Sequence, residues 1–221
     1  MFDFLAYRPM NSYMPKPPGD DPVSFIRIIN AYNSSKKIDV YGNGRIFTRS
    51  LGQKKFTPYM IIQSRQYRIN VYRSGKMSNP AADTIYAFEP DMIYTIAVIG
   101  DNKGEIIIIR DTKPSIEKGK SGIRAANLCQ DAPMVDMITH DGKYIFNGIL
   151  YKDTTDYISI APSKYSFKIK PSGSDVSIYT IPIRDIRQDW NYTFYIVKPL
   201  SVLMLIDGNT YIKKAKQEAK S

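Results

Sequence analysis

Residues 25–31 read Phe-Ile-Arg-Ile-Ile-Asn-Ala, and residues 122–128 read Gly-Ile-Arg-Ala-Ala-Asn-Leu. The Arg and the Asn keep the same spacing in both stretches. Matching pairs recur at an offset of 97 or 98 positions: Arg27/Arg124, Asn30/Asn127, Asp39/Asp136, Tyr59/Tyr157, Tyr67/Tyr165, Tyr94/Tyr192 and Thr95/Thr193. Such an offset is longer than the roughly 20–50 residues of a solenoid unit and is the size of a domain. The chain therefore predicts two homologous domains in tandem.

Within each repeat, apolar side chains alternate with more polar ones. Tyr67, Ile69 and Val71 alternate with neighbours that include charged and amide side chains, and residues 165–170 repeat the pattern. Successive side chains of a strand point to opposite faces, so a period of two indicates one buried and one exposed face. This pattern predicts strands in both halves.

Four other segments are apolar without alternation. Residues 94–99 and 192–197 are apolar on both faces, which predicts central strands. Residues 105–110 and 201–207 are short runs of bulky aliphatic residues, which predict further buried strands.

Short turn sequences separate these segments. Asn43-Gly44 and Asp141-Gly142 favour two-residue type I′ hairpins, which need positive φ at both central positions. Residues 101–104 form another turn sequence between two apolar runs. Loops this short favour antiparallel pairing, because parallel strands need long crossovers. We therefore predict an all-β protein made of two tandem immunoglobulin-like antiparallel β-sandwich domains.

Composition and charge divide the chain further. The chain has 221 residues and a net charge of +10. The expected organisation is an extended Pro- and Tyr-rich arm at 1–21, a sandwich at 22–111, a linker at 112–121, a second sandwich at 122–208 and a basic tail at 209–221. No run approaches the roughly 18 apolar residues of a transmembrane helix.

The sequence lacks the residues that several kinds of site require. A single cysteine, Cys129, cannot form an internal disulfide, and one histidine, His140, cannot complete a zinc site or a Ser-His-Asp triad of the usual kind. Residues 118–121 read Lys-Gly-Lys-Ser, but Pro114 stands where a phosphate-binding loop needs Gly. We therefore expect no catalytic residue, no metal site and no cofactor, and we predict that the protein is not an enzyme.

Residues 123–136 carry a family resemblance. They read Ile-Arg-Ala-Ala-Asn-Leu-Cys-Gln-Asp-Ala-Pro-Met-Val-Asp, and a Gly turn, two Tyr and a late Tyr-Thr follow. This pattern, over about residues 23–207, resembles the bacterial domain-of-unknown-function 4397 family. The resemblance implies tandem immunoglobulin-like sandwiches, without an established activity. In this family the late Tyr-Thr strand usually ends in glycine. The first repeat keeps this glycine as Gly100, and the second repeat departs from the pattern with Lys198.

The polar residues shared by the repeats allow two interpretations. They could form a site for an anionic or sugar ligand, or they could be structural, with a buried Asp accepting from backbone N–H groups and an Arg–Asp pair closing the edge of each sandwich. We favour the structural interpretation for Arg27, Asn30, Asp39, Arg124, Asn127 and Asp136. Tyr94 and Tyr192 start a late strand and are expected to form tyrosine corners, with each hydroxyl bonded to upstream backbone.

Exposed aromatic side chains are the candidates for ligand binding. Tyr72, Tyr151, Tyr179 and Trp190 are expected to be exposed and able to stack on sugar rings. The net positive charge favours acidic or carbohydrate polymers, or another envelope or coat protein, as partners. Nucleic acid is not expected, because no known nucleic-acid-binding motif is present.

Two function classes follow from these observations. The first is a non-enzymatic structural or adhesion-type protein, a rigid rod of two sandwiches in a bacterial cell envelope or spore layer. The alternative is a binding module for a carbohydrate or anionic cell-wall polymer. The N-terminus lacks the basic, apolar and small-residue segments of a secretory signal. We therefore expect cytoplasmic synthesis, followed by association with the spore or the envelope.

Overall fold

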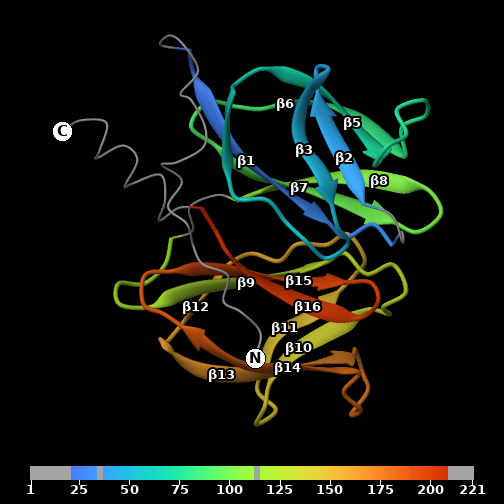
Figure 1. Ribbon diagram of the computed structural model, residues 1–221. Coiled ribbons are helices and arrows are strands. Elements are labelled where there is room, and N and C mark those ends of the chain that lie inside the picture. The colour runs from blue at the N-terminus through green and yellow to red at the C-terminus, as the bar shows by residue number, and fades with distance from the viewer. Residues whose placement is uncertain (1–20, 34–36, 112–114, 209–221) are drawn as a thin grey trace.

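The computed structural model describes residues 21–33, 37–111 and 115–208, and within these ranges it contains sixteen strands and no helix (Figure 1). The prediction of an all-β protein is confirmed. Almost all of the predicted arm and the whole of the predicted tail lie outside the described residues. In the described part, no helix has the length and apolarity to cross a membrane.

The first eight strands form one sandwich of two four-stranded sheets. The inner sheet has the order β4-β1-β7-β8 and the outer sheet has the order β3-β2-β5-β6. The bounds are β1 Val23–Asn30, β2 Ile38–Gly42, β3 Arg45–Leu51, β4 Met60–Gln63, β5 Gln66–Arg73, β6 Ala82–Ala87, β7 Ile93–Gly100 and β8 Gly104–Arg110.

The last eight strands repeat this arrangement. The inner sheet has the order β12-β9-β15-β16 and the outer sheet has the order β11-β10-β13-β14. The bounds are β9 Ser121–Asn127, β10 Val135–Thr139, β11 Tyr144–Ile149, β12 Ile158–Ile160, β13 Ser163–Pro171, β14 Tyr179–Ile186, β15 Asn191–Val197 and β16 Ser201–Ile206.

One strand pair in each half departs from the predicted antiparallel pairing. Strand β1 runs parallel to β7, with Arg27 opposite Thr95, and β9 runs parallel to β15, with Arg124 opposite Thr193. The chain crosses to the outer sheet and returns between these strands, so the crossover that parallel pairing requires is supplied by other strands. Short loops therefore fix only the pairing of strands that are neighbours along the chain.

The predicted turns form, with one difference in geometry. Asn43 and Gly44 both have positive φ, at 49° and 75°, as the predicted type I′ hairpin requires. In the second half only Gly142 has positive φ, and residues 140–143 make a longer connection closed by a hydrogen bond from Gly142 N–H to Thr139 O at 3.0 Å. The type I′ prediction is therefore right for the first hairpin and wrong for the second.

The non-alternating apolar segments have two different positions. Strands β7 and β15 are central and buried, as predicted. Strands β8 and β16, predicted to be buried, are instead edge strands with mostly half-buried side chains. An edge strand lies beside only one neighbour, so its aliphatic side chains cover the margin of the core.

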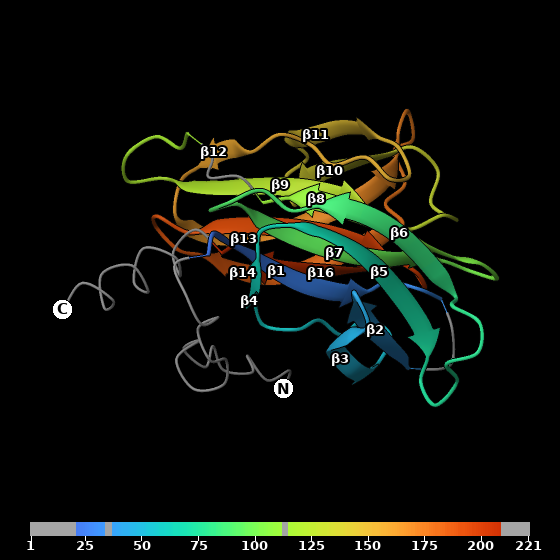
Figure 2. The same cartoon turned by 90° about the horizontal axis from the view of Figure 1, so that it is seen from above.

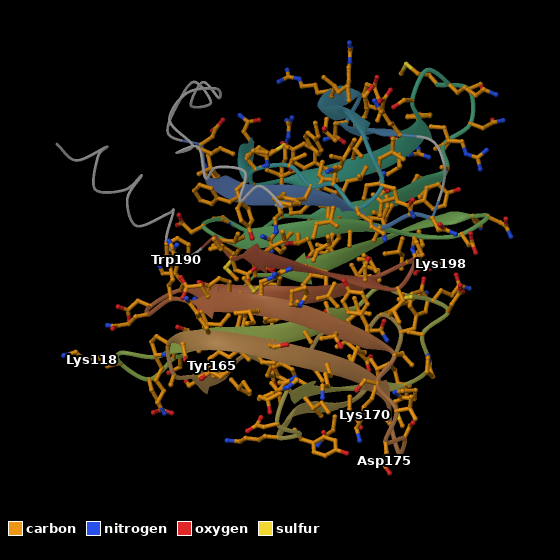
Figure 3. All side chains as sticks on the ribbon, turned by 60° about the horizontal axis from the view of Figure 1, so that its bottom comes forward. Lys118, Tyr165, Lys170, Asp175, Trp190 and Lys198 are labelled. Carbon is orange, nitrogen blue, oxygen red and sulfur yellow. The ribbon has the colours of Figure 1, made fainter. Side chains whose placement is uncertain are left out.

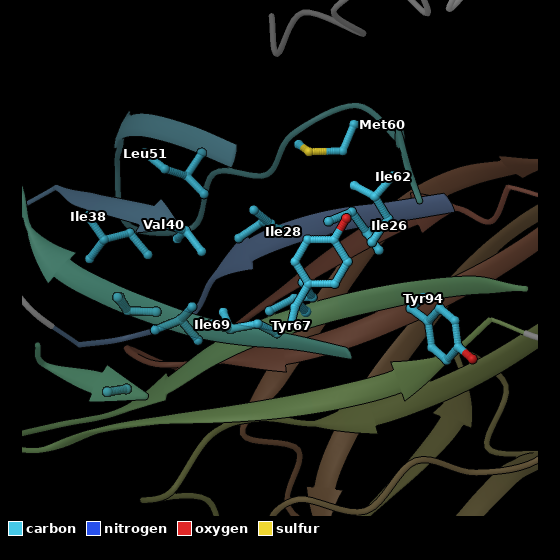
Figure 4. Close-up of a cluster of buried hydrophobic side chains, with 14 of the residues drawn as sticks. Ile26, Ile28, Ile38, Val40, Leu51, Met60, Ile62, Tyr67, Ile69 and Tyr94 are labelled. Carbon is cyan, nitrogen blue, oxygen red and sulfur yellow. The ribbon is translucent and has the colours of Figure 1, made fainter. Parts of the chain in front are cut away.

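Each half has its own hydrophobic core between its two sheets. In the first half, Ile26 and Ile28 of β1 meet Val40, Ile69 and other buried side chains (Figure 4). A second cluster, around Phe167 and Phe194, fills the other sandwich. The two halves are therefore separate sandwiches and do not share a single core.

A third apolar cluster joins the two sandwiches. It contains Ile29, Ala97 and Ile99 from the first inner sheet together with Ala126 and Tyr195 from the second, among others. The inner sheets face each other, and the four sheets form a stack (Figures 1 and 2). This side-by-side packing corrects the expected rod. It also explains why β7 and β15 are apolar on both faces, since one face meets its own core and the other meets the other sandwich.

Candidate functional site

A cluster of charged and hydroxyl side chains lies between the two inner sheets, and we call it the central cluster. Its members come from both halves: Arg27, Tyr59, Thr95 and Asp111 from the first, and Arg124, Tyr157, Thr193, Tyr195 and Asp207 from the second. The inner-sheet strands position most of these side chains. Successive side chains point to opposite faces, so Ile26 and Ile28 enter the first core while Arg27 points to the other half.

Two Arg–Asp pairs cross between the halves. The Arg27 guanidinium donates to Asp207 Oδ1 at 2.5 Å and to the Ile206 carbonyl at 2.8 Å. In the reciprocal pair, Arg124 donates to Asp111 Oδ1 and to the Arg110 carbonyl. Each arginine thus binds the residue after the last strand of the opposite sandwich and the carbonyl before it. Charge-assisted bonds of this kind are shorter and stronger than neutral ones.

Each aspartate is oriented by hydroxyls of its own half. Asp111 Oδ2 accepts from Tyr59 at 2.7 Å and from Thr95 at 2.6 Å. Asp207 Oδ2 accepts from Tyr157 and Thr193 at the same two distances. One carboxylate oxygen is therefore held within the sandwich, which leaves the other oxygen to bind the arginine from across the interface.

The two halves of the central cluster differ at one position. Tyr195 of β15 occupies the place that Ala97 has in β7, and its hydroxyl accepts from Arg27 at 2.9 Å and donates to Thr95 at 3.3 Å. Arg27 also lies over the rings of Tyr59 and Tyr195, at 4.8 and 5.5 Å from their centroids. Arg124 lies over one ring, that of Tyr157, at 4.5 Å. The first arginine is thus the more enclosed of the two.

Burial and charge set the protonation of the central cluster. Asp111 and Asp207 are 0% exposed, and Arg27 is 2% exposed. Burial raises the pKa of Asp207, and the Arg27 guanidinium opposes that rise. Burial also raises the pKa of Tyr59 and of Tyr157, so both phenols stay protonated and donate to the aspartates.

The central cluster leaves no polar atom for a ligand. Every buried side-chain nitrogen and oxygen in the described part of the chain has a hydrogen-bond partner. In the same part, no group of three or more His, Cys, Asp and Glu residues is arranged to hold a metal ion. The polar groups of the central cluster therefore bind one another, both within each half and between the two halves of the protein.

The predicted pairing of Arg and Asp within each repeat is wrong. Asp39 accepts from Ser50 N–H at 2.7 Å and Ser74 Oγ at 2.6 Å, and Asp136 accepts from Gly148 N–H and Ser172 Oγ at 2.8 and 2.6 Å. These aspartates therefore hold turns beside the outer sheets, while the arginines cross the interface. The sequence placed Arg and Asp in the same repeat without indicating which side chains share a face.

The repeated asparagines and tyrosines make matching local bonds. Asn30 donates to Leu51 O at 2.8 Å, and Asn127 donates to Ile149 O at 3.2 Å. The hydroxyl of Tyr94 accepts from the Glu89 N–H, and that of Tyr192 accepts from the Arg187 N–H, in each case five residues upstream. The two Tyr bonds have the geometry of a tyrosine corner, with the hydroxyl acting as acceptor.

The four aromatic residues predicted to bind sugar are dispersed. Tyr72 lies on β5 of the first outer sheet, where it contacts Tyr41 edge-on, and Tyr179 begins β14 of the second outer sheet. Trp190 precedes β15 and stacks on Tyr192, whereas Tyr151 follows β11 and packs against the cluster between the halves. All four are half-buried, which corrects the expectation that they are exposed. Among the described residues, no ring contact joins any two of these four.

Asp111, Asp207 and Tyr195 were not predicted from the sequence as functional residues. The two aspartates follow the last strand of each sandwich and are 96 positions apart, so the repeat offset itself was the available signal. Tyr195 carried no such signal, because the matching residue is Ala97.

Comparisons with known proteins give a family and two similar structures. No curated protein matches the chain. The Bacillus anthracis TIE protein is 11% identical with a TM-score of 0.25; the match covers 80% of this chain and 34% of that one, so this chain spans about a third of its length. A Parabacteroides distasonis protein named as a putative cell adhesion protein is 8% identical with a TM-score of 0.24, over 84% of this chain and 97% of that one. A model for a domain of unknown function, DUF4397, matches residues 24–138, more than half of the 221 residues, and the chain therefore belongs to the DUF4397 family.

Proposed function

We propose that the protein is a non-enzymatic structural or adhesion-type protein of a bacterial cell envelope or spore layer. Its two sandwiches act as one rigid block. The observation that carries this proposal is the central cluster, in which Arg27 and Arg124 each bind an aspartate of the opposite sandwich.

The central cluster supports rigidity because it specifies one relative orientation of the sandwiches. Any rotation that separates Arg27 from Asp207 takes a buried guanidinium away from the carboxylate that binds it across the interface, and such a loss costs several kcal/mol. The apolar cluster beside it excludes water from the same interface. A block of this kind transmits load between its two outer sheets without bending at a hinge.

Further contacts at one end of the interface act in the same direction. Lys198 of the second half lies 2.5 Å from Asp101 of the first, and Lys152 lies 2.7 Å from Glu105. The side-chain amide of Gln53 donates to the Lys198 carbonyl at 3.1 Å. The two sandwiches are therefore linked at the edge of the interface as well as at its centre.

The net charge of the whole chain, +10, supports an acidic setting for the protein. Anionic polymers of a cell wall, or acidic coat proteins, would attract a chain with this net charge. In this proposal the sandwiches supply the rigid body, and the excess basic charge of the chain supplies the attraction to the surrounding layer.

Fractionation of the producing cells tests the proposal. A tagged chain should be recovered with the envelope or the spore layers and should stay there through a low-salt wash. Recovery of all of the protein as a free cytosolic monomer would contradict a structural role.

A pair of variants links that location to the rigid block. Asp207→Ala removes one crossed pair, and Asp83→Ala removes an exposed pair with Arg68 on the outer sheet. We expect the first variant to be recovered less in the particulate fraction and the second to behave like the wild type. Urea unfolding shows whether Asp207→Ala lowers the free energy of unfolding. If it does, and both variants are still recovered equally in the particulate fraction, the location does not depend on the rigid block and the proposal is contradicted.

A further inference from the structure

A polar cleft opens at the edge of the interface between the two sandwiches. Its walls are formed by both halves of the chain. The lining residues are Gly100, Lys103, Gly104 and Glu105 from the first half and Gln130, Tyr151 and Lys152 from the second.

The internal repeat gives this cleft a counterpart. The Lys54 N–H donates to Asn30 O at 2.7 Å, and the Lys152 N–H donates to Asn127 O at the same distance. The residues just before these two lysines, Gln53 and Tyr151, are therefore equivalent. By the offset of 98 that relates β7 to β15, Gly100 is equivalent to Lys198.

At the counterpart position the junction is closed by side chains. Gln53 Nε2 donates to Asn33 Oδ1 and to the Lys198 carbonyl, both at 3.1 Å. Asn33 in turn donates to Asp101 at 2.8 Å, and the Lys198 ammonium lies 2.5 Å from both Asp101 and Asp131. Lys198 lies at the end of β15 opposite Trp190 (Figure 3). The polar groups of this junction bind one another.

At the cleft the same positions are open. Gly100 has no side chain to cross the interface, and Tyr151 stands where the other junction has the bridging amide. The Tyr151 hydroxyl, the Gln130 amide and the Lys103 ammonium line the cleft without a hydrogen bond to any described residue. Three polar groups from both halves are therefore available to one ligand.

The chemistry of the lining selects the class of ligand. The Tyr151 ring packs against the apolar cluster between the halves, and the Lys152 ammonium lies over the ring at 5.3 Å from its centroid, so the ring is held in place with its hydroxyl as a polar tip. Lys152 and Glu105, whose charges lie 2.7 Å apart, add donors and acceptors beside it. Lys103 adds a positive charge, which gives the cleft an excess of one positive charge.

We propose that this cleft binds an acidic saccharide. The ring edge and the hydroxyl of Tyr151 would contact a sugar ring, while Gln130 and the Lys152–Glu105 pair bond its hydroxyls and Lys103 binds its carboxylate. Ligand sites combine apolar surface with a few convergent polar groups in this way. The proposal does not depend on the structural role, because binding is measured on the purified full chain.

Titration with a tetramer of galacturonic acid, followed by calorimetry and amide NMR shifts, tests this site. We expect shifts at Gln130, Tyr151 and Lys152, and weaker binding of the methyl ester, which keeps the sugar and loses the charge. Tyr151→Ala should lower affinity about tenfold, the loss of roughly one aromatic contact. No binding of the acidic tetramer would overturn the proposal, as would equal binding of the ester.

Matched variants show whether binding occurs in this cleft. Tyr151→Gln introduces the amide that closes the other junction and should weaken binding with little change in folding. Tyr72→Ala removes a half-buried tyrosine from the first outer sheet and should bind the tetramer like the wild type. Binding that survives Tyr151→Gln and is reduced by Tyr72→Ala would place the ligand elsewhere and overturn the proposal.

Discussion

The centre and the edge of the interface use similar ion pairs in different surroundings. At the centre, Asp207 is 0% exposed and is bound by an arginine, a threonine and a tyrosine. At the edge, the side chain of Asp101 is 39% exposed and is bound by Lys198 and Asn33. Water can replace the partner of an exposed charge, but not that of a buried one. The difference indicates that the burial of an ion pair, more than the distance between its charges, decides how much the pair contributes to stability.

The largest expected effect is the loss of a central carboxylate. Asp207→Ala leaves the Arg27 guanidinium buried without its carboxylate and removes the acceptor of Thr193 and Tyr157. We expect the free energy of unfolding to fall by about 3–5 kcal/mol, measured by urea denaturation. Asp111→Ala should have a similar effect, because it breaks the reciprocal pair.

Two controls isolate the cause of that loss. Asp83→Ala breaks an exposed pair with Arg68 and should change the unfolding free energy by no more than about 1 kcal/mol. Combining Asp207→Leu with Arg27→Met removes both charges and should recover much of the stability. If the double variant were as unstable as Asp207→Ala, an uncompensated charge would not be the cause.

An intermediate effect is expected at the residue that makes the two halves of the central cluster unequal. Tyr195→Phe removes the hydroxyl that accepts from Arg27 and donates to Thr95, and it keeps the ring. The unfolding free energy should fall by about 1–3 kcal/mol. Tyr72→Phe, on the outer sheet, is the matched control and should have almost no effect; equal effects would contradict a special role for Tyr195.

A smaller effect is expected at the edge of the interface. Lys198→Met removes the ammonium that lies between Asp101 and Asp131 and keeps most of the aliphatic chain. The loss should be below about 1 kcal/mol and should shrink at high salt, because exposed pairs are screened. If Lys198→Met lowered the free energy of unfolding as much as Asp207→Ala does, the expected difference between the centre and the edge of the interface would be wrong.

The smallest expected effect is a dependence on acid pH at the same edge. The hydrogen bonds from Lys198 and Asn33 hold the pKa of Asp101 below its ordinary value of 3.8. Its folded pKa lies below the unfolded one, so its contribution is present above pH 3.8 and is lost as pH falls through the folded value.

Comparing urea midpoints at about pH 5 and pH 3 measures this dependence. The wild type should lose slightly more stability on acidification than Lys198→Met, in which Asp101 has lost one of its two side-chain partners. An equal loss in the two proteins would show that this pair contributes nothing to the acid dependence.

The strands were predictable because their pattern is local. Alternation in residues 67–72 follows from a sheet with one wet face, and the hairpin at Asn43 and Gly44 follows from the φ angles those residues tolerate. The repeat offset extended this reasoning to the second half. Local rules therefore recovered the sandwiches, apart from the parallel pairs, the geometry of the second hairpin turn and the positions of β8 and β16.

The docking of the two halves was not predictable by the same reasoning. Arg27 and Asp207 are 180 positions apart and belong to different sandwiches, so no local pattern joins them. The apolar residues on both faces of β7 and β15 indicated that both faces of these strands are covered, but did not show that each sandwich covers the other. The central cluster and the cleft both lie at this interface, so neither was identified from the sequence.

The crossed pairing also has a consequence for biosynthesis. Arg27 is made early, and the carboxylate that neutralises it lies 180 residues later. At about 5–20 residues per second, a ribosome needs roughly 10–40 s to reach Asp207. During that interval the newly made first sandwich presents its inner sheet as a surface for chaperones or for a neighbouring nascent chain, and the pair forms only after Asp207 has been made.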